Sequence, residues 1–264
     1  MNSAIDDGVN RKGLVSIFVG IFARPKATMR YLSQAHRRWW LIPVLIALIA
    51  VTAQGVVYAS NNAEIYYQRE LEFFESLQAE ERGGMVQPPS KPPLQPLAVG
   101  VPVAGKFLGT VVTWLIWAGL LLLLGTFLGQ NGAGFGAFFA MVAWAWMPLA
   151  LRNLVQGLYM FATGETVYNQ GLSGLVVDRA PAPITPGYRP YTMPTSGQQA
   201  LAALLGRIDI YTIWYLVLIA LGVMAFARFS AKRAWLGTAG IWLLLTLLSL
   251  LPSLIGFGQG LRLF

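Results

Sequence analysis

Five long, mostly apolar stretches divide this chain, and charged residues, prolines or glycines separate them. Each has about 18 to 25 residues, and an α-helix of that length covers most or all of the roughly 30 Å hydrocarbon core of a bilayer. A charged residue costs roughly 2.5 to 3.5 kcal/mol at the centre of an inserted helix, which explains why the charges lie at the ends. The expected spans are residues 39–59, 107–128, 138–162, 210–227 and 234–257. The sequence therefore predicts an all-α integral membrane protein with a bundle of five transmembrane helices in residues 39–264.

The composition supports this class. The chain is 56% hydrophobic and 11% charged, whereas soluble domains have about 25% charged residues. In a membrane protein the net charge of +8 reports first on orientation. It is therefore not evidence for nucleic-acid binding, and we expect none.

The first 38 residues are expected to form a cytosolic segment with one interfacial amphipathic helix. Apolar residues recur there at the spacing of one helical face: Leu14, Ile17, Phe18, Ile21 and Phe22. Basic residues flank this face, as in helices that lie on an anionic membrane surface. The alternative is a cleaved signal peptide, but Arg24-Pro25-Lys26 follows the apolar run in place of a small-residue cleavage site.

The distribution of basic residues predicts the orientation. Seven precede the first span, namely Arg11, Lys12, Arg24, Lys26, Arg30, Arg37 and Arg38, and three lie between the last two spans, namely Arg228, Lys232 and Arg233. Both groups face the cytoplasm only if the N-terminus is cytoplasmic and the C-terminus is outside. The two long polar segments, 60–106 and 163–209, then become outer loops. The first is expected to contain an acidic helix over residues 64–82, and the second a short interfacial helix over residues 196–205.

The residue inventory leaves little room for catalysis. The chain has no cysteine and one histidine, His36, too few for a thiol or histidine metal site. Gly132, Gly134 and Ala137 formally match a dinucleotide-binding fingerprint, but the strand before it and the acid after it that the motif needs are missing. We expect no catalytic, cofactor or metal site.

Arg152 and Asp209 are the best candidates for buried polar residues. Arg152 lies well inside the third expected span after Pro148, which should kink that helix, and Asp209 begins the fourth. A charge within the membrane suggests function by default, although Arg152 could also extend to the interface. Asp209 is suited to cap its helix by accepting from the N–H of Tyr211 or Thr212. We expect Arg152 and Asp209 to meet, because an unpaired charge at that depth is costly.

Three segments resemble the Yip1 family of small multi-pass membrane proteins. The first is residues 21–26 with the Trp39-Trp40 pair, and the second is residues 143–148. The third is the segment from Asp209 to Ala234, and it is the most specific. The residues that carry the family motifs are Pro25, Pro148, Asp209, Trp214, Gly222, Lys232 and Ala234. The resemblance is to prokaryotic members, and it implies five membrane helices, a cytosolic N-terminus and a place in the plasma membrane.

Two functions follow as alternatives. The first is a non-enzymatic scaffold or membrane-organising protein whose partners are the bilayer and another membrane protein or further copies of itself. The second is a transport protein or a permease-like subunit. A polar cavity lined by Arg152, Gln156, Asp209 and Tyr211 would favour transport, and a filled bundle would favour the scaffold.

Overall fold

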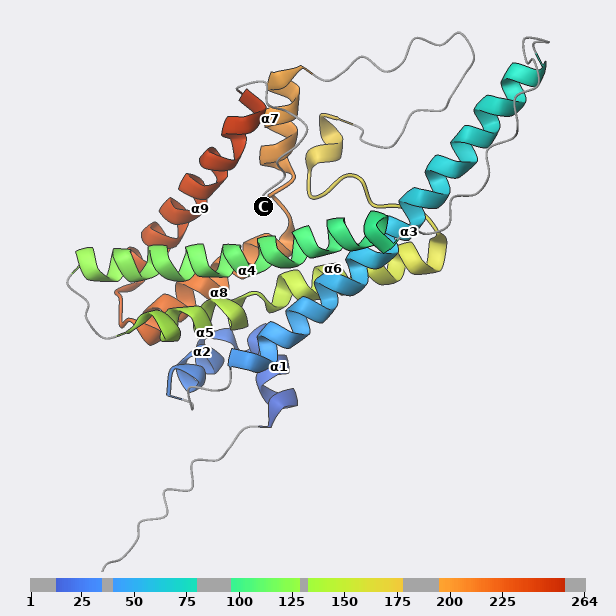
Figure 1. Cartoon of the computed structure of the whole chain (residues 1–264). Coiled ribbons are helices and arrows are strands. Elements are labelled where there is room, and N and C mark those ends of the chain that lie inside the picture. The colour runs from blue at the N-terminus through green and yellow to red at the C-terminus, as the bar shows by residue number, and fades with distance from the viewer. Residues whose placement is uncertain (1–12, 35–39, 80–95, 129–132, 178–194, 255–264) are drawn as a thin grey trace, which may run out of the picture.

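The computed structural model describes residues 13–34, 40–79, 96–128, 133–177 and 195–254, and helices account for most of them (Figure 1). The helices are α1 (Leu14–Ala23), α2 (Pro25–Gln34), α3 (Leu41–Ala79), α4 (Pro96–Phe127), α5 (Phe135–Ala145), α6 (Met147–Thr163), the short 3₁₀ helix η2 (Ser173–Leu175), α7 (Ser196–Leu205), α8 (Ile210–Phe226) and α9 (Ala231–Leu254). The all-α membrane class predicted from the sequence is confirmed.

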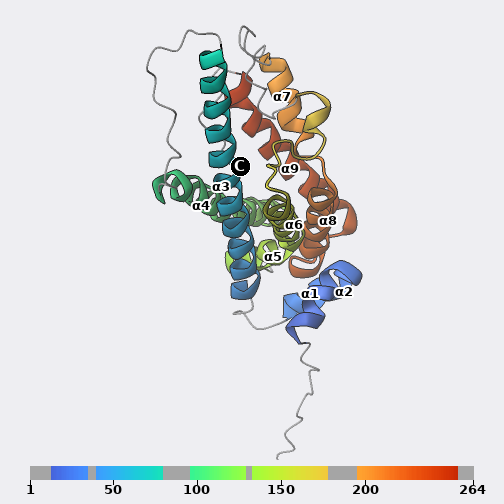
Figure 2. The ribbon, with the colours of Figure 1, turned by 90° about the vertical axis from the view of Figure 1, so that its right-hand side faces the viewer.

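Helices α1 and α2 form a tight helical hairpin. Pro25 begins α2 directly after Arg24 ends α1, because proline has no N–H to satisfy and its fixed φ suits a first helical turn. Gly20 faces Thr28 so closely that a Cβ at Gly20 would collide with the threonine hydroxyl. The hairpin packs through α2 against α8 and α5, and Figure 2 shows it below the long helices.

The apolar face expected on α1 does not point to the membrane as a whole. Ile17 and Ile21 are fully buried in the protein core, whereas Val15 and Val19 on another face are 78% and 55% exposed. The helix has apolar residues on nearly all sides. One side can therefore pack against the protein while another remains an exposed apolar surface. Ile17 and Ile21, which were expected on the membrane-facing side, therefore pack inside the protein.

The first span continues far beyond its predicted end. Helix α3 runs for 39 residues, roughly 58 Å at 1.5 Å per residue, and includes the described part of the acidic helix expected at 64–82. Helix α4 likewise begins at Pro96, well before the expected start at 107, and accommodates Pro102 within it. Much of the expected outer loop 60–106 is thus helical, because an acidic amphipathic segment can extend an apolar helix into water without a break.

The third span is two helices joined at Trp146. Pro148, the second residue of α6, has no N–H to donate back to α5. The N–H groups of Leu149 and Ala150 instead both bond to the carbonyl of Trp146, at 2.9 and 3.1 Å. Pro148 thus interrupts the helical hydrogen bonds at Trp146, as expected for a proline kink, and the two helices still form one candidate span, Phe135–Thr163.

The fourth span is also broken. Helix α8 has 17 residues, roughly 25 Å, which falls short of a hydrocarbon core. It meets α7 at a 62° bend across residues 206–209. Four segments are long and apolar enough to cross a membrane: Leu41–Glu75, Val99–Phe127, Phe135–Thr163 and Ala231–Leu251. The bent pair brings the number to five if it counts as one span.

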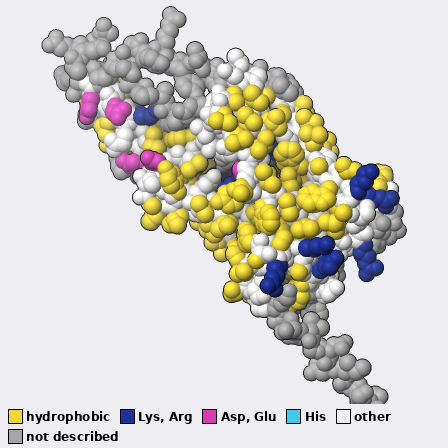
Figure 3. All heavy atoms as spheres, turned by 180° about the vertical axis from the view of Figure 1, so that it is seen from behind, with side chains coloured by type: hydrophobic (Ala, Val, Ile, Leu, Met, Phe, Trp, Pro, Cys, Tyr) yellow, Lys and Arg dark blue, Asp and Glu magenta, His cyan; other side chains and the backbone are white. Residues whose placement is uncertain are grey.

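Charge is strongly segregated over the surface. Figure 3 shows most of the Lys and Arg side chains gathered at one end, Asp and Glu mainly toward the other, and a broad hydrophobic face between them. The exposed acids Glu70, Glu72 and Glu75 lie on the C-terminal half of α3, and the basic end is formed by α2 and the turn between α8 and α9. This is the pattern of a bundle with its apolar belt in lipid and its charged ends in water.

Candidate functional site

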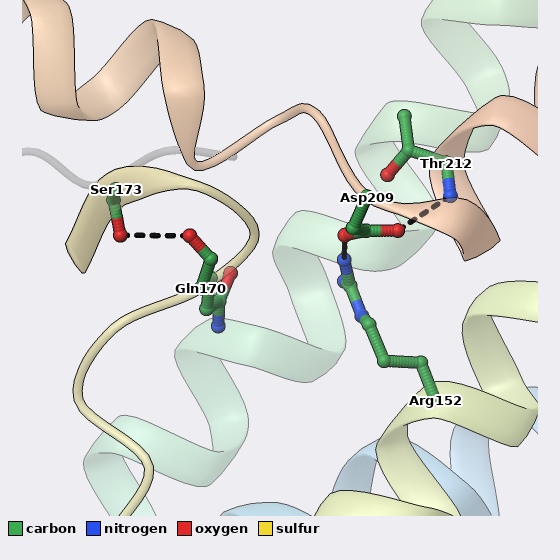
Figure 4. Close-up of polar contacts among 5 residues, drawn as sticks. All are labelled: Arg152, Gln170, Ser173, Asp209 and Thr212. Atoms are coloured by element: carbon green, nitrogen blue, oxygen red, sulfur yellow. Dashed lines mark hydrogen bonds and ion pairs between the residues drawn. The ribbon is translucent and has the colours of Figure 1, made fainter. Parts of the chain in front are cut away.

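Arg152 of α6 and Asp209, which precedes α8, form an ion pair within the bundle. The Arg152 Nη1 donates to Asp209 Oδ2 at 2.7 Å, and the two side chains are only 19% and 13% exposed (Figure 4). Opposite charges that are largely shielded from solvent attract more strongly than they would at an open surface. The contact therefore fixes the point at which α8 begins against the side of α6.

Asp209 uses its second oxygen to cap α8. Oδ1 accepts from the N–H of Thr212 at 2.7 Å, and the backbone of Asp209 is extended, as an N-cap residue requires. The Asp209 carboxylate thus accepts hydrogen bonds from a backbone N–H at the start of α8 and from the Arg152 guanidinium. Arg152 Nε is buried and has no hydrogen-bond partner within the described ranges.

A loop after α6 closes over the bend between α7 and α8. The N–H of Leu172 donates to the carbonyl of Leu205 at 3.0 Å. Gly171 has φ +52°, and a Cβ there would lie 2.7 to 3.0 Å from the carbonyl oxygens of Ile208, Leu205 and Gly206. Only glycine can take this conformation and approach carbonyls so closely at low cost. The buried Ser173 hydroxyl donates to Gln170 O at 2.7 Å and stabilises the same loop (Figure 4).

Aromatic rings surround the break in the third span. Trp146, at the break, lies 5.4 Å from Tyr215 of α8 and 5.9 Å from Trp114 of α4, measured between ring centroids, and both contacts are edge-to-face. Trp117 adds a third edge-to-face contact with Tyr215 at 5.6 Å. The indole N–H groups of Trp114 and Trp146 and the hydroxyl of Tyr215 are buried and have no partner in the part of the chain that the structure describes. The rings link α4, the break and α8 by packing.

A second polar link joins α3 to the end of α6. The Asn61 side-chain amide donates to the carbonyls of Met160 at 2.9 Å and of Glu165 at 3.1 Å, which satisfies backbone groups at a helix terminus. The Tyr168 hydroxyl donates to Asn62 Oδ1 at 3.0 Å. Burial raises the pKa of Tyr168, so it remains a protonated donor. Sequence reasoning missed this link and the Gly171 loop, because amides and glycines in polar segments carry no distinctive spacing.

The other residues singled out in the sequence are spread along the bundle. Trp214 is partly buried, Gly222 and Ala234 are buried, and Lys232 is exposed at the basic end. Gln156 and Tyr211, the further residues of the expected cavity, are each partly buried. The structure thus joins Arg152 and Asp209 directly and leaves the remaining motif residues apart from that pair.

The described residues hold no group of three or more His, Cys, Asp and Glu side chains that could bind a metal ion. Arg152 and Asp209 pair with each other, and neither is held near a nucleophile in the contacts described above. The arrangement can join α6 to the start of α8. The fold and this site define an all-α, multi-pass membrane protein.

Comparison with known protein families agrees with the multi-pass membrane class. A sequence model of the Yip1 domain matches residues 19–252. The chain therefore belongs to the Yip1 domain family, as the sequence resemblance indicated. No curated protein and no solved structure matches it.

Proposed function

We propose that this protein is a non-enzymatic membrane organiser whose α1–α2 hairpin lies in the cytoplasmic leaflet. The observation that carries the proposal is the exposed apolar face of α1: Val15 and Val19 are open, while Ile17 and Ile21 fix the helix to the protein. An apolar helix held at the basic end of the bundle can enter one leaflet and displace lipid there. The family is not known for enzymatic activity, which supports the non-enzymatic assignment.

The proposal includes an orientation and a location. The N-terminus is cytoplasmic, the C-terminus is outside and the membrane is the plasma membrane. The segregation of basic and acidic side chains to opposite ends of the structure supports this orientation (Figure 3).

Sorting by membrane curvature tests the role of α1. The full chain is reconstituted into liposomes of mixed diameter, and its density is measured vesicle by vesicle. We expect wild type to concentrate in small vesicles and the Val15→Gln/Val19→Gln variant to lose that preference, because its exposed face becomes polar. The control Val15→Leu/Val19→Leu keeps the face apolar and should sort like wild type. Unchanged sorting by the glutamine variant would contradict the proposal.

As a scaffold, the protein would also bind a membrane partner or further copies of itself. Crosslinking and co-purification from the native membrane in mild detergent address this point. A stoichiometric partner, or a defined homo-oligomer, supports the scaffold. If the chain is recovered only as a monomer, the partner-binding role is contradicted, and only the insertion of α1 into the leaflet remains as the proposal.

Transport is the second candidate, and the break in the fourth span favours it. Discontinuous membrane helices often surround ligand sites in transporters, and here the bend before α8 carries the Arg152–Asp209 pair. Because the chain has no cysteine, Gln156→Cys and Tyr211→Cys each give a single reactive thiol. Labelling of both from outside by a membrane-impermeant reagent would indicate a water-filled cavity and favour transport. Protection of both would favour the filled bundle of a scaffold.

A further inference from the structure

Six basic side chains from distant parts of the sequence gather at one end of the molecule. They are Arg24, Lys26, Arg30, Arg228, Lys232 and Arg233, all exposed. Helix α2 packs on α8, and buried residues beneath both segments, Met29, Leu32, Phe229 and Ala234, belong to one hydrophobic core. Figure 3 shows the dark blue side chains grouped at this end. We refer to these six residues as the basic end.

The basic end has no counter-charge among the described residues. The described acids are Glu64, Glu70, Glu72, Glu75, Glu165 and Asp209. The first four lie on the C-terminal half of α3, Glu165 follows α6, and Asp209 is occupied by Arg152. Six neighbouring cations without an acid among them produce a positive potential that attracts anions.

The stability of the helices does not explain why basic residues occupy the positions of the basic end. Lys26, Lys232 and Arg233 lie in the first turns of α2 and α9, where the helix dipole disfavours a cation. Arg228 has φ +56°, a conformation that glycine adopts at lower cost at a helix end. The chain therefore keeps cations at four places where neutral residues would suit the backbone better.

We propose that the basic end binds the headgroups of anionic phospholipids. The apolar helices α3 and α9 begin at this level, at Leu41 and Ala231, so the cations stand at the depth of lipid phosphates. The exposed apolar residues of α1 belong to the same end and would contact the acyl chains of the same leaflet. Charge and apolar surface together match a lipid, whereas an acidic soluble protein would use only the charge. The inference deepens the proposed function by naming its lipid.

The strength of the interaction can be estimated. A basic residue near an anionic membrane surface contributes on the order of fivefold in binding. Neutralising two of the six should therefore lower the preference for an anionic lipid by roughly 25-fold. High salt should weaken the preference in wild type as well.

Native mass spectrometry of the detergent-solubilised full chain, titrated with phosphatidylglycerol or phosphatidylcholine, measures this preference. We expect wild type to favour phosphatidylglycerol, and Lys26→Gln/Arg30→Gln and Lys232→Gln/Arg233→Gln each to lose most of that preference. Lys26→Arg/Arg30→Lys keeps both charges and should retain it. The matched control Arg69→Gln/Lys106→Gln removes two cations elsewhere in the chain and should also retain it. A Ser230→Cys labelling assay on each variant verifies that the orientation is unchanged.

Several outcomes would overturn the assignment. Equal binding of the two lipids by wild type would do so, as would an equal loss in the control variant. Displacement of lipid by inorganic phosphate at matched concentration would assign the surface to a free anion. Binding of poly-glutamate without a headgroup preference would assign it to an acidic protein. Curvature sorting tests Val15 and Val19, whereas the lipid titration tests the basic end. The lipid preference can therefore be interpreted even if the curvature experiment contradicts the proposed function.

Discussion

Gly222 of α8 lies directly against Met141 of α5. A Cβ added at Gly222 would lie 2.5 Å from Met141 Cγ and 2.6 Å from its Sδ, and Met141 is itself fully buried. The absence of a side chain at this point is what allows α5 and α8 to touch, a use of glycine that is common between membrane helices.

Gly222→Ala should therefore destabilise the protein, by about 1 to 3 kcal/mol, because overpacking forces a shift in a filled core. Thermal unfolding in detergent measures the loss. Gly240→Ala is the matched control, since no atom outside its own helix lies within 4 Å of its Cβ position, and it should be neutral or slightly stabilising. A double-mutant cycle in which Gly222→Ala costs less in the Met141→Ala background than in wild type would identify the collision as the cause.

Arg152→Leu should cost about 3 to 5 kcal/mol, because it leaves the Asp209 carboxylate buried without its partner. Asp209→Asn keeps a side-chain oxygen for the Thr212 N–H, since asparagine is also a good N-cap. The double variant Arg152→Leu/Asp209→Asn should be more stable than Arg152→Leu alone, because no uncompensated charge remains. Unfolding in a denaturing-detergent titration gives the three values, and a single variant that inserts and melts like wild type would show that the pair contributes nothing.

Gly171→Ala should loosen the loop over the bend between α7 and α8. Its φ of +52° and the carbonyls within 3.0 Å leave no room for a methyl group, and such strain costs of order 1 to 3 kcal/mol. Limited proteolysis of residues 164–177 should become faster. Gly197→Ala, which meets nothing within 4 Å, should leave the cleavage rate unchanged, and equal effects of the two substitutions would remove the steric explanation.

The orientation can be read with single cysteines, because the chain has none of its own. We expect Ser230→Cys, in the exposed turn between α8 and α9, to react with an impermeant maleimide only from the cytoplasmic side. Gly197→Cys, exposed at the start of α7, should react only from outside. Labelling of both from the same side would show that α7 and α8 do not form a single crossing.

The sequence alone determined the class of the fold. Apolar length and the exclusion of charge from the spans follow directly from the cost of burying a charge in hydrocarbon, and they gave the all-α membrane bundle. The starts of α2, α7 and α8 also follow from local chemistry, namely Pro25, the Thr195 capping box and the Asp209 cap.

Tertiary structure decided which helices break and which surfaces meet. The bend between α7 and α8 is held by a contact between residues far apart in the chain, Leu172 with Leu205. A hydropathy pattern measures only how apolar a segment is, so it could not tell that Val15 faces outward while Ile17 faces inward. Arg152 and Asp209 were candidates by charge, but their 2.7 Å contact arises only because α6 and α8 pack side by side.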